Sequence, residues 1–138
     1  MHITLESDYA VRIVYCLAKN PVRMDAKKIS DETGVTLRFS LKILRKLVAG
    51  GLIKSYKGTK GGYELGRDPS EISLANVIET VEGSYALARC VAEDDYQCNR
   101  NFHSTSCGIC KFHAVYSEIS QMVRERLNDV KFSQLIEN

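Results

Sequence analysis

The feature of the sequence that most constrains the fold is a pair of short predicted helices joined by a tight turn. Asp25 is a suitable N-cap for the first of them, and Gly34 is a suitable C-terminal stop. Thr36 can cap the second helix, which runs to about Ala49 and ends at Gly50. Two helices joined by so short a Thr-Gly-Val-Thr connection form a helix-turn-helix arrangement.

The residues after this helix pair predict a small β-hairpin. The stretch 52–56 is strand-like, 57–62 is a glycine-rich turn with two lysines, and 63–65 returns as a second strand. A turn over 66–69 then leads to a further helix, from Leu74 to about Val81, which Ser73 can cap. A helix-turn-helix followed by a basic hairpin is a winged helix, so the predicted fold class is mainly α-helical with a small β-hairpin wing.

The spacing of apolar residues predicts which helix faces are buried. A helix over 4–19 has large apolar residues four positions apart. They are Leu5, Tyr9, Ile13 and Leu17. In the helix after Thr36 the expected buried stripe is Leu37, Leu41, Leu44, Leu47 and Val48. Cys16 lies beside the apolar face of the first helix and is expected to be a small core residue.

Charge is distributed unevenly along the chain. The 138 residues contain 19 Lys and Arg against 17 Asp and Glu, a formal net charge of +2. Residues 36–63 contain seven basic side chains and no acidic one, which leaves a net charge of −5 for the remainder. Because the positive segment coincides with the second helix of the pair and the wing, the near-neutral total does not argue against nucleic acid.

The polar and basic positions of this segment are candidate contacts to double-stranded DNA. Arg38 is the expected base contact, since its guanidinium suits the guanine edge in the major groove. Lys42, Lys54 and Lys57 are expected to pair with phosphates, and the wing to approach the minor groove. The alternative is a solvated basic face. The candidate DNA-binding residues are Thr36, Arg38, Ser40, Lys42, Arg45, Lys54, Lys57, Thr59, Lys60 and Gly61.

Four of the five cysteines lie in one short stretch. Between 82 and about 110 the sequence is polar, with little helical periodicity, and so long a loop in a small domain needs a stabilising partner. A bound metal centre would supply one. The clustered thiols are Cys90, Cys98, Cys107 and Cys110. Clustered thiolates suit an iron–sulfur centre or zinc, and their spacing alone does not separate the two.

A long helix is predicted after the cysteines, from Lys111 to about Val130. Its apolar residues alternate at spacings of three and four: Phe112, Val115, Tyr116, Ile119, Met122, Val123 and Leu127. About 19 helical residues span roughly 28 Å, a longer apolar stripe than so small a domain buries on itself. We therefore expect this helix to pair two subunits in a homodimer. Residues 132–136 are expected to fold back as a short helix.

Two classes of protein are not expected. No apolar run approaches the roughly 20 residues of a membrane span, and the start MHITLESD is too polar for a secretory signal, so a cytoplasmic protein is expected. The sequence also has no nucleotide-binding loop, nucleophile elbow or paired-carboxylate signature, so we do not expect an enzyme.

The combination of these motifs resembles the Rrf2 family of bacterial transcriptional regulators. The resemblance covers nearly the whole chain: the first helix, the helix-turn-helix, the wing ending in Gly-Gly-Tyr-Glu-Leu at 61–65, and the cysteine stretch before a long helix. It is strongest to the iron–sulfur-sensing branch of IscR and NsrR. The resemblance implies a homodimer on a partly palindromic operator, with one [2Fe–2S] or [4Fe–4S] cluster per subunit whose state alters DNA affinity.

The resemblance also implies which residues hold the cluster. The family's three cysteine ligands map to Cys90, Cys98 and Cys110, the last of which begins the family's C-x-x-H ending. The spacing here is longer than in the family's more compact loop. Cys107 is an extra thiol in the second gap, and it could be the third ligand, a reserve ligand or a partner in a redox disulfide.

The fourth ligand in the family is not a cysteine. The resemblance offers two candidates, His113 from the C-x-x-H ending or Asp8 contributed by the partner subunit. From the residues alone, the alternative for Asp8 is a surface ion pair with Arg12 one helical turn later, and the alternative for His113 is a half-buried helix residue.

The predicted organisation has three parts. They are a winged helix-turn-helix DNA-binding domain over 1–82, a cysteine-bearing cluster loop over 83–111, and a dimerisation helix with the C-terminal segment over 112–138. The predicted function is a transcriptional regulator that senses redox state, nitric oxide or iron–sulfur status. The alternatives are a cluster-free family regulator answering to a metabolite or partner protein, a zinc-stabilised regulator, and a redox or metal-handling protein in which the basic segment is incidental.

Overall fold

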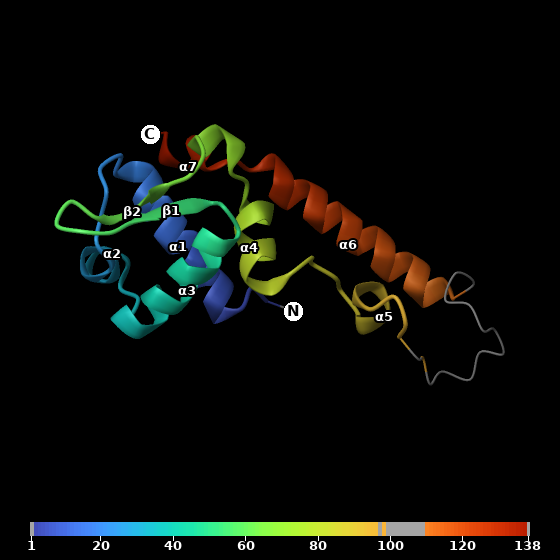
Figure 1. Ribbon diagram of the computed structural model, residues 1–138. Helices are drawn as coiled ribbons and strands as arrows, with labels where there is room; N and C mark the ends of the chain where they lie inside the picture. Colours follow the sequence, from blue (N-terminus) through green and yellow to red (C-terminus); the bar gives the residue numbers. More distant parts are fainter. Residues whose placement is uncertain (1, 97, 99–109, 138) are drawn as a thin grey trace.

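The chain forms a winged-helix body from which one long helix extends (Figure 1). The computed structural model describes residues 2–96, 98 and 110–137. The helices are α1 (Leu5–Lys19), α2 (Ala26–Thr33), α3 (Leu37–Ala49), α4 (Leu74–Glu82), α5 (Arg89–Ala92), α6 (Lys111–Asp129) and α7 (Phe132–Ile136), with a 3₁₀ turn η1 (Pro69–Glu71). The strands are β1 (Ile53–Tyr56) and β2 (Gly62–Leu65). This order confirms the predicted fold class.

Side-chain caps and one glycine fix the helix-turn-helix. Asp25 accepts a hydrogen bond from the backbone amide of Lys28 at 2.8 Å, and Thr36 accepts one from the amide of Phe39 at 3.3 Å. Gly34 ends α2 with φ of 72°, a left-handed conformation that favours glycine. These are the capping roles that the sequence predicts for the three residues.

The wing is an antiparallel hairpin tied to the body by a third segment. Its register pairs Ile53 with Leu65, and the backbones of Met24 and Tyr63 exchange two hydrogen bonds, of 3.0 and 2.8 Å. Gly62 has φ of 137°, and a Cβ there would lie 2.7 Å from the carbonyl oxygen of Met24. Glycine is therefore required where the hairpin meets the connection between α1 and α2.

The core surrounds α1, which packs against α2, α3, α4 and α7. The C-terminal segment belongs to this core, since Phe132 at the start of α7 is fully buried. Its amide donates to the carbonyl of Ile72 at 2.9 Å, and the amide of Leu74 donates to the carbonyl of Val130 at 3.0 Å. The end of the chain thus returns from α6 to the winged-helix body (Figure 1).

Three leucines that the sequence assigns to buried faces are exposed. Leu5 is 59% exposed, Leu37 45% and Leu41 43%. The buried residues of α3 are Ser40, Ile43, Leu44 and Leu47. This set follows the i, i+3, i+4, i+7 spacing of one helix face. The predicted stripe was wrong because it took every leucine as inward and overlooked a small buried serine at the centre of the face.

The stretch before α6 contains one helix that the sequence did not predict. α5 has four residues, too few to produce a detectable apolar period. Arg89 in this helix pairs with Glu93 at 3.4 Å and lies 5.5 Å from the ring centroid of Tyr96. These polar contacts link α5 to the residues that follow it, and they leave no hydrophobic pattern in the sequence.

Cys16 is part of the core, as predicted. Its side chain is 8% exposed, and its thiol donates to the Glu32 carboxylate at 3.5 Å. Burial and the neighbouring Glu32 carboxylate raise the pKa of the Cys16 thiol to about 11, from an ordinary value of 9.0. The thiolate is the nucleophilic form, so Cys16 is expected to be unreactive at neutral pH.

Alkylation of the folded protein with iodoacetamide tests this expectation. At pH 8 a thiol with a pKa of about 11 is roughly 0.1% ionised, against roughly 10% at the ordinary value. We expect mass spectrometry of peptides to show Cys98 modified while Cys16 stays unmodified. Alkylation in guanidinium chloride is the control, and Cys16 should then react. Equal rates at the two cysteines in the folded protein would contradict the assignment.

Candidate nucleic-acid interface and metal centre

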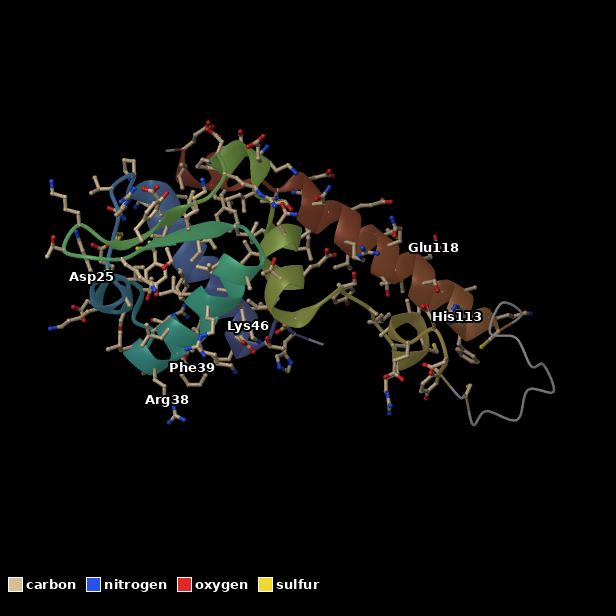
Figure 2. The ribbon with its side chains drawn as sticks, in the orientation of Figure 1. Asp25, Arg38, Phe39, Lys46, His113 and Glu118 are labelled. Atoms are coloured by element: carbon tan, nitrogen blue, oxygen red, sulfur yellow. The ribbon has the colours of Figure 1, made fainter. Side chains whose placement is uncertain are left out.

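The outer face of α3 presents basic side chains to solvent. Arg38, Lys42 and Arg45 are all exposed, and Arg38 points away from the body (Figure 2). Within the described residues, no carboxylate lies within ion-pairing distance of Arg38 or Arg45. Their charges are therefore available to an anionic partner.

Two of the predicted contact residues on α3 have structural roles. Ser40 is fully buried, and its hydroxyl donates to the Val35 carbonyl at 3.4 Å. The expectation that Ser40 faces DNA was wrong, because the phase of α3 turns this position into the core. Thr36 is exposed but serves as the N-cap of α3.

Glu6 in the first turn of α1 binds two lysines of α3. Its carboxylate accepts a hydrogen bond from Lys46 at 2.6 Å and lies 3.7 Å from Lys42. Lys46 also donates to the carbonyl of Val81 in α4 at 3.3 Å. The Lys46 hydrogen bond and the charges of both lysines hold the pKa of Glu6 below its ordinary value of 4.5. Nothing in the sequence signals this link, because the partners are 36 to 40 positions apart.

Glu6→Gln is expected to lower the free energy of unfolding by about 0.5–1 kcal/mol at pH 7, since it removes the partly exposed carboxylate that pairs with Lys46 and Lys42. A carboxyl whose pKa is lowered by folding stabilises the protein above its unfolded pKa, and this contribution disappears as pH falls through the folded value. The difference between wild type and variant should therefore shrink as the pH is lowered below about 4.5.

Urea unfolding followed by circular dichroism from pH 7 to pH 3 measures this difference. The exposed Glu71 offers a matched control, and Glu71→Gln should leave stability within about 0.3 kcal/mol of wild type. A Glu6→Gln deficit that stays constant across the pH range would refute the ion-pair explanation.

The wing presents its cations at the edge of the body. Lys54, Lys57, Thr59 and Lys60 are exposed, while Gly61 is half-buried. The Gly61 amide donates to the Gly58 carbonyl at 3.0 Å, and a Cβ at Gly61 would collide with the Tyr56 carbonyl oxygen. Gly61 therefore shapes the hairpin turn.

Arg23 braces the base of the wing, a role that the sequence analysis missed. Its guanidinium lies 3.4 Å from the ring centroid of Tyr56 on β1 and pairs with Glu64 on β2 at 3.3 Å. An aromatic ring and a carboxylate on facing strands hold an arginine in this way by cation–π and ionic attraction. Arg23 thus links both strands to the segment before α2.

The cysteine region lies at the opposite end of the subunit. α5, which carries Cys90, packs against the first turns of α6, far from the wing and α3 (Figure 1). Cys90 and Cys110 are half-buried, Cys98 is exposed, and Cys110 stands at the N-cap position of α6 without a side-chain capping hydrogen bond. Cys107 lies outside the described residues. Among those that are described, no three His, Cys, Asp or Glu side chains converge as a metal-binding group.

His113 carries the clearest sign of a missing partner in this region. Its Nδ1 atom is buried, and within the described part of the chain it has no hydrogen-bond partner. A buried ring nitrogen without a partner is unfavourable unless something outside these residues binds it. Its position three residues after Cys110 on α6 (Figure 2) fits a metal or cluster ligand.

Asp8 does not approach the cysteines of its own chain. It lies in α1 within the body and pairs with Arg12 at 2.7 Å, with both side chains about half exposed. The ion pair is the simpler of the two interpretations that the sequence left open. Within one subunit the structure therefore brings Cys90, Cys110 and His113 to one region and leaves Asp8 outside it (Figure 1).

The apolar residues of α6 lie along one broad side of the helix, part of which the body covers. Tyr116, Val123 and Leu127 are half-buried, and the latter two line a pocket of about 550 Å³ beside α4 and the start of the chain. The remaining part of this side is exposed: Phe112 and Val115 at 50%, Ile119 at 38% and Met122 at 61%. This exposed set, here called the α6 stripe, is a large apolar surface for a helix that projects from the body.

Comparison with known proteins assigns the chain to a protein family. Residues 3–138 match the family model of Rrf2, described as an iron-dependent transcriptional regulator. The chain belongs to the Rrf2 family. It is a transcriptional regulator, and DNA binding is implied by the family. The predicted resemblance is confirmed.

Relatives of this Rrf2 protein include named transcriptional regulators. The chain is 29% identical over its whole length to the HTH-type transcriptional regulator IscR of Klebsiella pneumoniae, of which the match covers 81%. It is also 35% identical to Protein aau3 of Rhizobium meliloti over 99 residues. This match covers 71% of this chain and 64% of Protein aau3. The prediction that the protein is not an enzyme is likewise confirmed.

Solved structures confirm the Rrf2 fold. CymR, the global cysteine regulator of B. subtilis, superposes with a TM-score of 0.74 at 22% identity, over 99% of this chain and 96% of CymR. The IscR of T. potens gives the same TM-score at 20% identity, over 99% and 86% of the two chains. In the described part of the chain, no helix combines the length and apolar character that crossing a membrane requires.

Proposed function

We propose that this Rrf2 protein is a homodimeric repressor or activator that binds a partly palindromic operator with an affinity set by an iron–sulfur cluster. One observation carries the proposal: exposed cations gather on α3 and the wing at one end of the subunit, while Cys90, Cys110 and His113 gather at the other. DNA binding and signal reception are then separate surfaces of one chain. The function requires a cytoplasmic location, where bacterial DNA lies.

At the DNA end, α3 enters the major groove as the recognition helix. Arg38 reads a guanine edge through its bidentate guanidinium, and Lys42, Arg45 and Lys54 neutralise phosphates. The wing brings Lys57, Lys60 and the Gly61 turn to the minor groove, with Thr59 at its tip. Arg23 and the Met24–Tyr63 bridge support this placement, because they hold the hairpin to the helix-turn-helix.

At the other end, the donor set fits an iron–sulfur cluster. Three thiols, those of Cys90, Cys98 and Cys110, would hold it. The buried Nδ1 of His113, which has no hydrogen-bond partner among the described residues, supports an imidazole as the fourth ligand. Asp8 of the partner subunit is the alternative fourth ligand, and Cys107 the alternative third. When bound, such a cluster supplies redox-active iron with one non-thiolate ligand, which small reactive molecules displace more readily than a thiolate.

α6 connects the two ends of the subunit. Its first turn carries Cys110 and His113, and Ser120 in its middle accepts a hydrogen bond from the Leu87 amide at 2.8 Å. Further along, Arg124 pairs with Glu79 of α4 at 3.2 Å, and α4 contacts α3. A displacement of α5 would therefore shift α6 relative to α4, and through α4 relative to α3. Because half-sites lie about one helical turn or a small multiple apart, a shift of a few ångströms between recognition helices weakens binding.

Anaerobic purification tests the proposal most directly. We expect brown protein with visible absorption, iron and acid-labile sulfide in comparable amounts, and loss of the colour in oxygen or nitric oxide. Fluorescence anisotropy with a genomic operator fragment should show different affinities for the cluster-loaded and cluster-free forms. For both forms, the logarithm of the association constant should fall linearly with the logarithm of the salt concentration, with a slope of about −0.9 per phosphate neutralised. Colourless protein with one zinc per chain would replace the cluster by a zinc site.

A cluster-free regulator is the second candidate, and one structural neighbour favours it. CymR, which shares the fold, is a cysteine regulator. A Cys90→Ala, Cys98→Ala double variant separates the candidates. If DNA affinity and its response to oxygen are unchanged in this variant, the regulator answers to a metabolite or partner protein instead.

A further inference from the structure

The recognition helix exposes two leucines among its cations. Leu37 is 45% and Leu41 43% exposed, one helical turn apart near the start of α3. At about 100° per residue, Leu41 lies about 60° from Arg38 and about 40° from Arg45 around the helix axis. The two leucines therefore form an apolar strip that borders the basic face.

This strip is distinct from the other apolar side chains of α3. Ile43, Leu44 and Leu47 are fully buried in the core. Phe39 lies on the other side of the basic face and is also 43% exposed, but its ring packs edge-on against Tyr9 of α1 with ring centroids 5.9 Å apart. Leu37 and Leu41 thus remain together on the outer surface of the helix beside charged residues, an arrangement typical of a surface that binds a partner.

The surrounding charge identifies the partner. Arg38 and Arg45 beside the strip have no carboxylate within ion-pairing distance among the described residues, so an apolar protein surface laid over it would bury unpaired cations. The major groove of DNA matches both features, because it is lined by phosphates and presents the 5-methyl group of thymine as its apolar element.

We propose that Leu37 and Leu41 contact the 5-methyl groups of thymines adjacent to the base that Arg38 reads. The inference rests on the proposed function, in which α3 enters the major groove. It adds a specificity rule: the operator half-site carries thymine, on either strand, beside the guanine bound by Arg38. Leucine supplies no hydrogen bond, so discrimination by these two positions is purely by methyl contact.

Uracil substitution isolates this contact, since uracil differs from thymine only by the 5-methyl group and keeps its base pairing. A duplex is first selected by the full-length protein from a random-sequence pool. It is then synthesised with uracil replacing one thymine at a time, and anisotropy gives each Kd at fixed salt. We expect uracil at one or two positions per half-site to weaken binding about three- to fivefold each, the effect of removing one buried methyl group.

Leu41→Ala and Leu37→Ala assign each methyl group to its leucine. Each variant should bind the thymine duplex about as weakly as wild type binds the relevant uracil duplex, and should no longer distinguish thymine from uracil there. Val22→Ala removes an aliphatic side chain that is 73% exposed and lies outside α3, so it should retain the full discrimination. Thermal unfolding of each variant confirms that it is folded.

Three results would overturn the inference. In the first, wild type binds all uracil duplexes as tightly as the parent duplex. In the second, the uracil effect persists undiminished in both leucine variants, which would indicate readout of DNA shape. In the third, the variants change only the oligomeric state, which would make the strip a protein interface. In each case the protein still binds the parent duplex with the expected salt dependence. Failure to select any duplex from the pool would instead refute the proposed function.

Discussion

Phe132→Ala is expected to lower the free energy of unfolding by about 3–5 kcal/mol, the effect of removing a buried aromatic side chain from a packed core. Phe132 is fully buried, and α7 lies against α1. Its loss would leave a cavity where the C-terminal segment meets the winged-helix body. This is a large fraction of the stability of a domain of this size.

Urea unfolding at one fixed protein concentration measures the effect, since dimerisation would make stability concentration-dependent. Leu135 on the same helix is 41% exposed, so Leu135→Ala is a matched control expected to change stability by less than about 1 kcal/mol. Equal effects of the two substitutions would mean that α7 is not held to the body through Phe132.

Local signals in the sequence were sufficient to place the helices of the body. Asp25, Thr36 and Ser73 each cap the helix assigned to them, and Gly34 ends α2 as expected. Such caps act through hydrogen bonds to residues two or three positions away, so their information is contained in a short window of sequence. The Phe132–Ile72 contact joins residues 60 positions apart and leaves no comparable signal.

The rotation of α3 was the main error, and it altered the candidate interface. Leucine content suggested that Leu37 and Leu41 face inward, whereas the buried set includes Ser40. A serine fits there because its hydroxyl bonds to the Val35 carbonyl. Neighbouring helices decide this phase, and a count of apolar residues in one helix does not contain it.

The two candidate sites differ in how far the sequence could predict them. Cations of α3 and the wing lie close together in the chain, and all those proposed as contacts are exposed. The cysteine region depends on how α5 meets α6, and α5 had no apolar period to reveal it. The Nδ1 atom of His113 has no hydrogen-bond partner in the described ranges, and its burial, which makes this informative, is not contained in a single sequence.

Ile119→Glu is expected to convert the proposed dimer to a monomer. Ile119 lies at the centre of the α6 stripe, between Val115 and Met122, all three of them exposed in the isolated subunit. A carboxylate there would have to be buried without a counter-charge when two stripes pair, which is strongly unfavourable. Light scattering should give a mass near the 15.5 kDa of one chain in place of twice that value.

Operator binding should fail together with the dimer. A monomer engages one half-site, whereas in a dimer the second half-site binds intramolecularly, so the loss of affinity is expected to be about 100-fold or more. The salt dependence should fall to about half, because half as many phosphates are neutralised. Gln121→Glu adds the same charge to an exposed position of α6 away from the stripe and should remain dimeric with wild-type affinity. A dimeric Ile119→Glu protein would show that the subunits pair through another surface, while a monomer that keeps full affinity would show that the operator is read by one subunit.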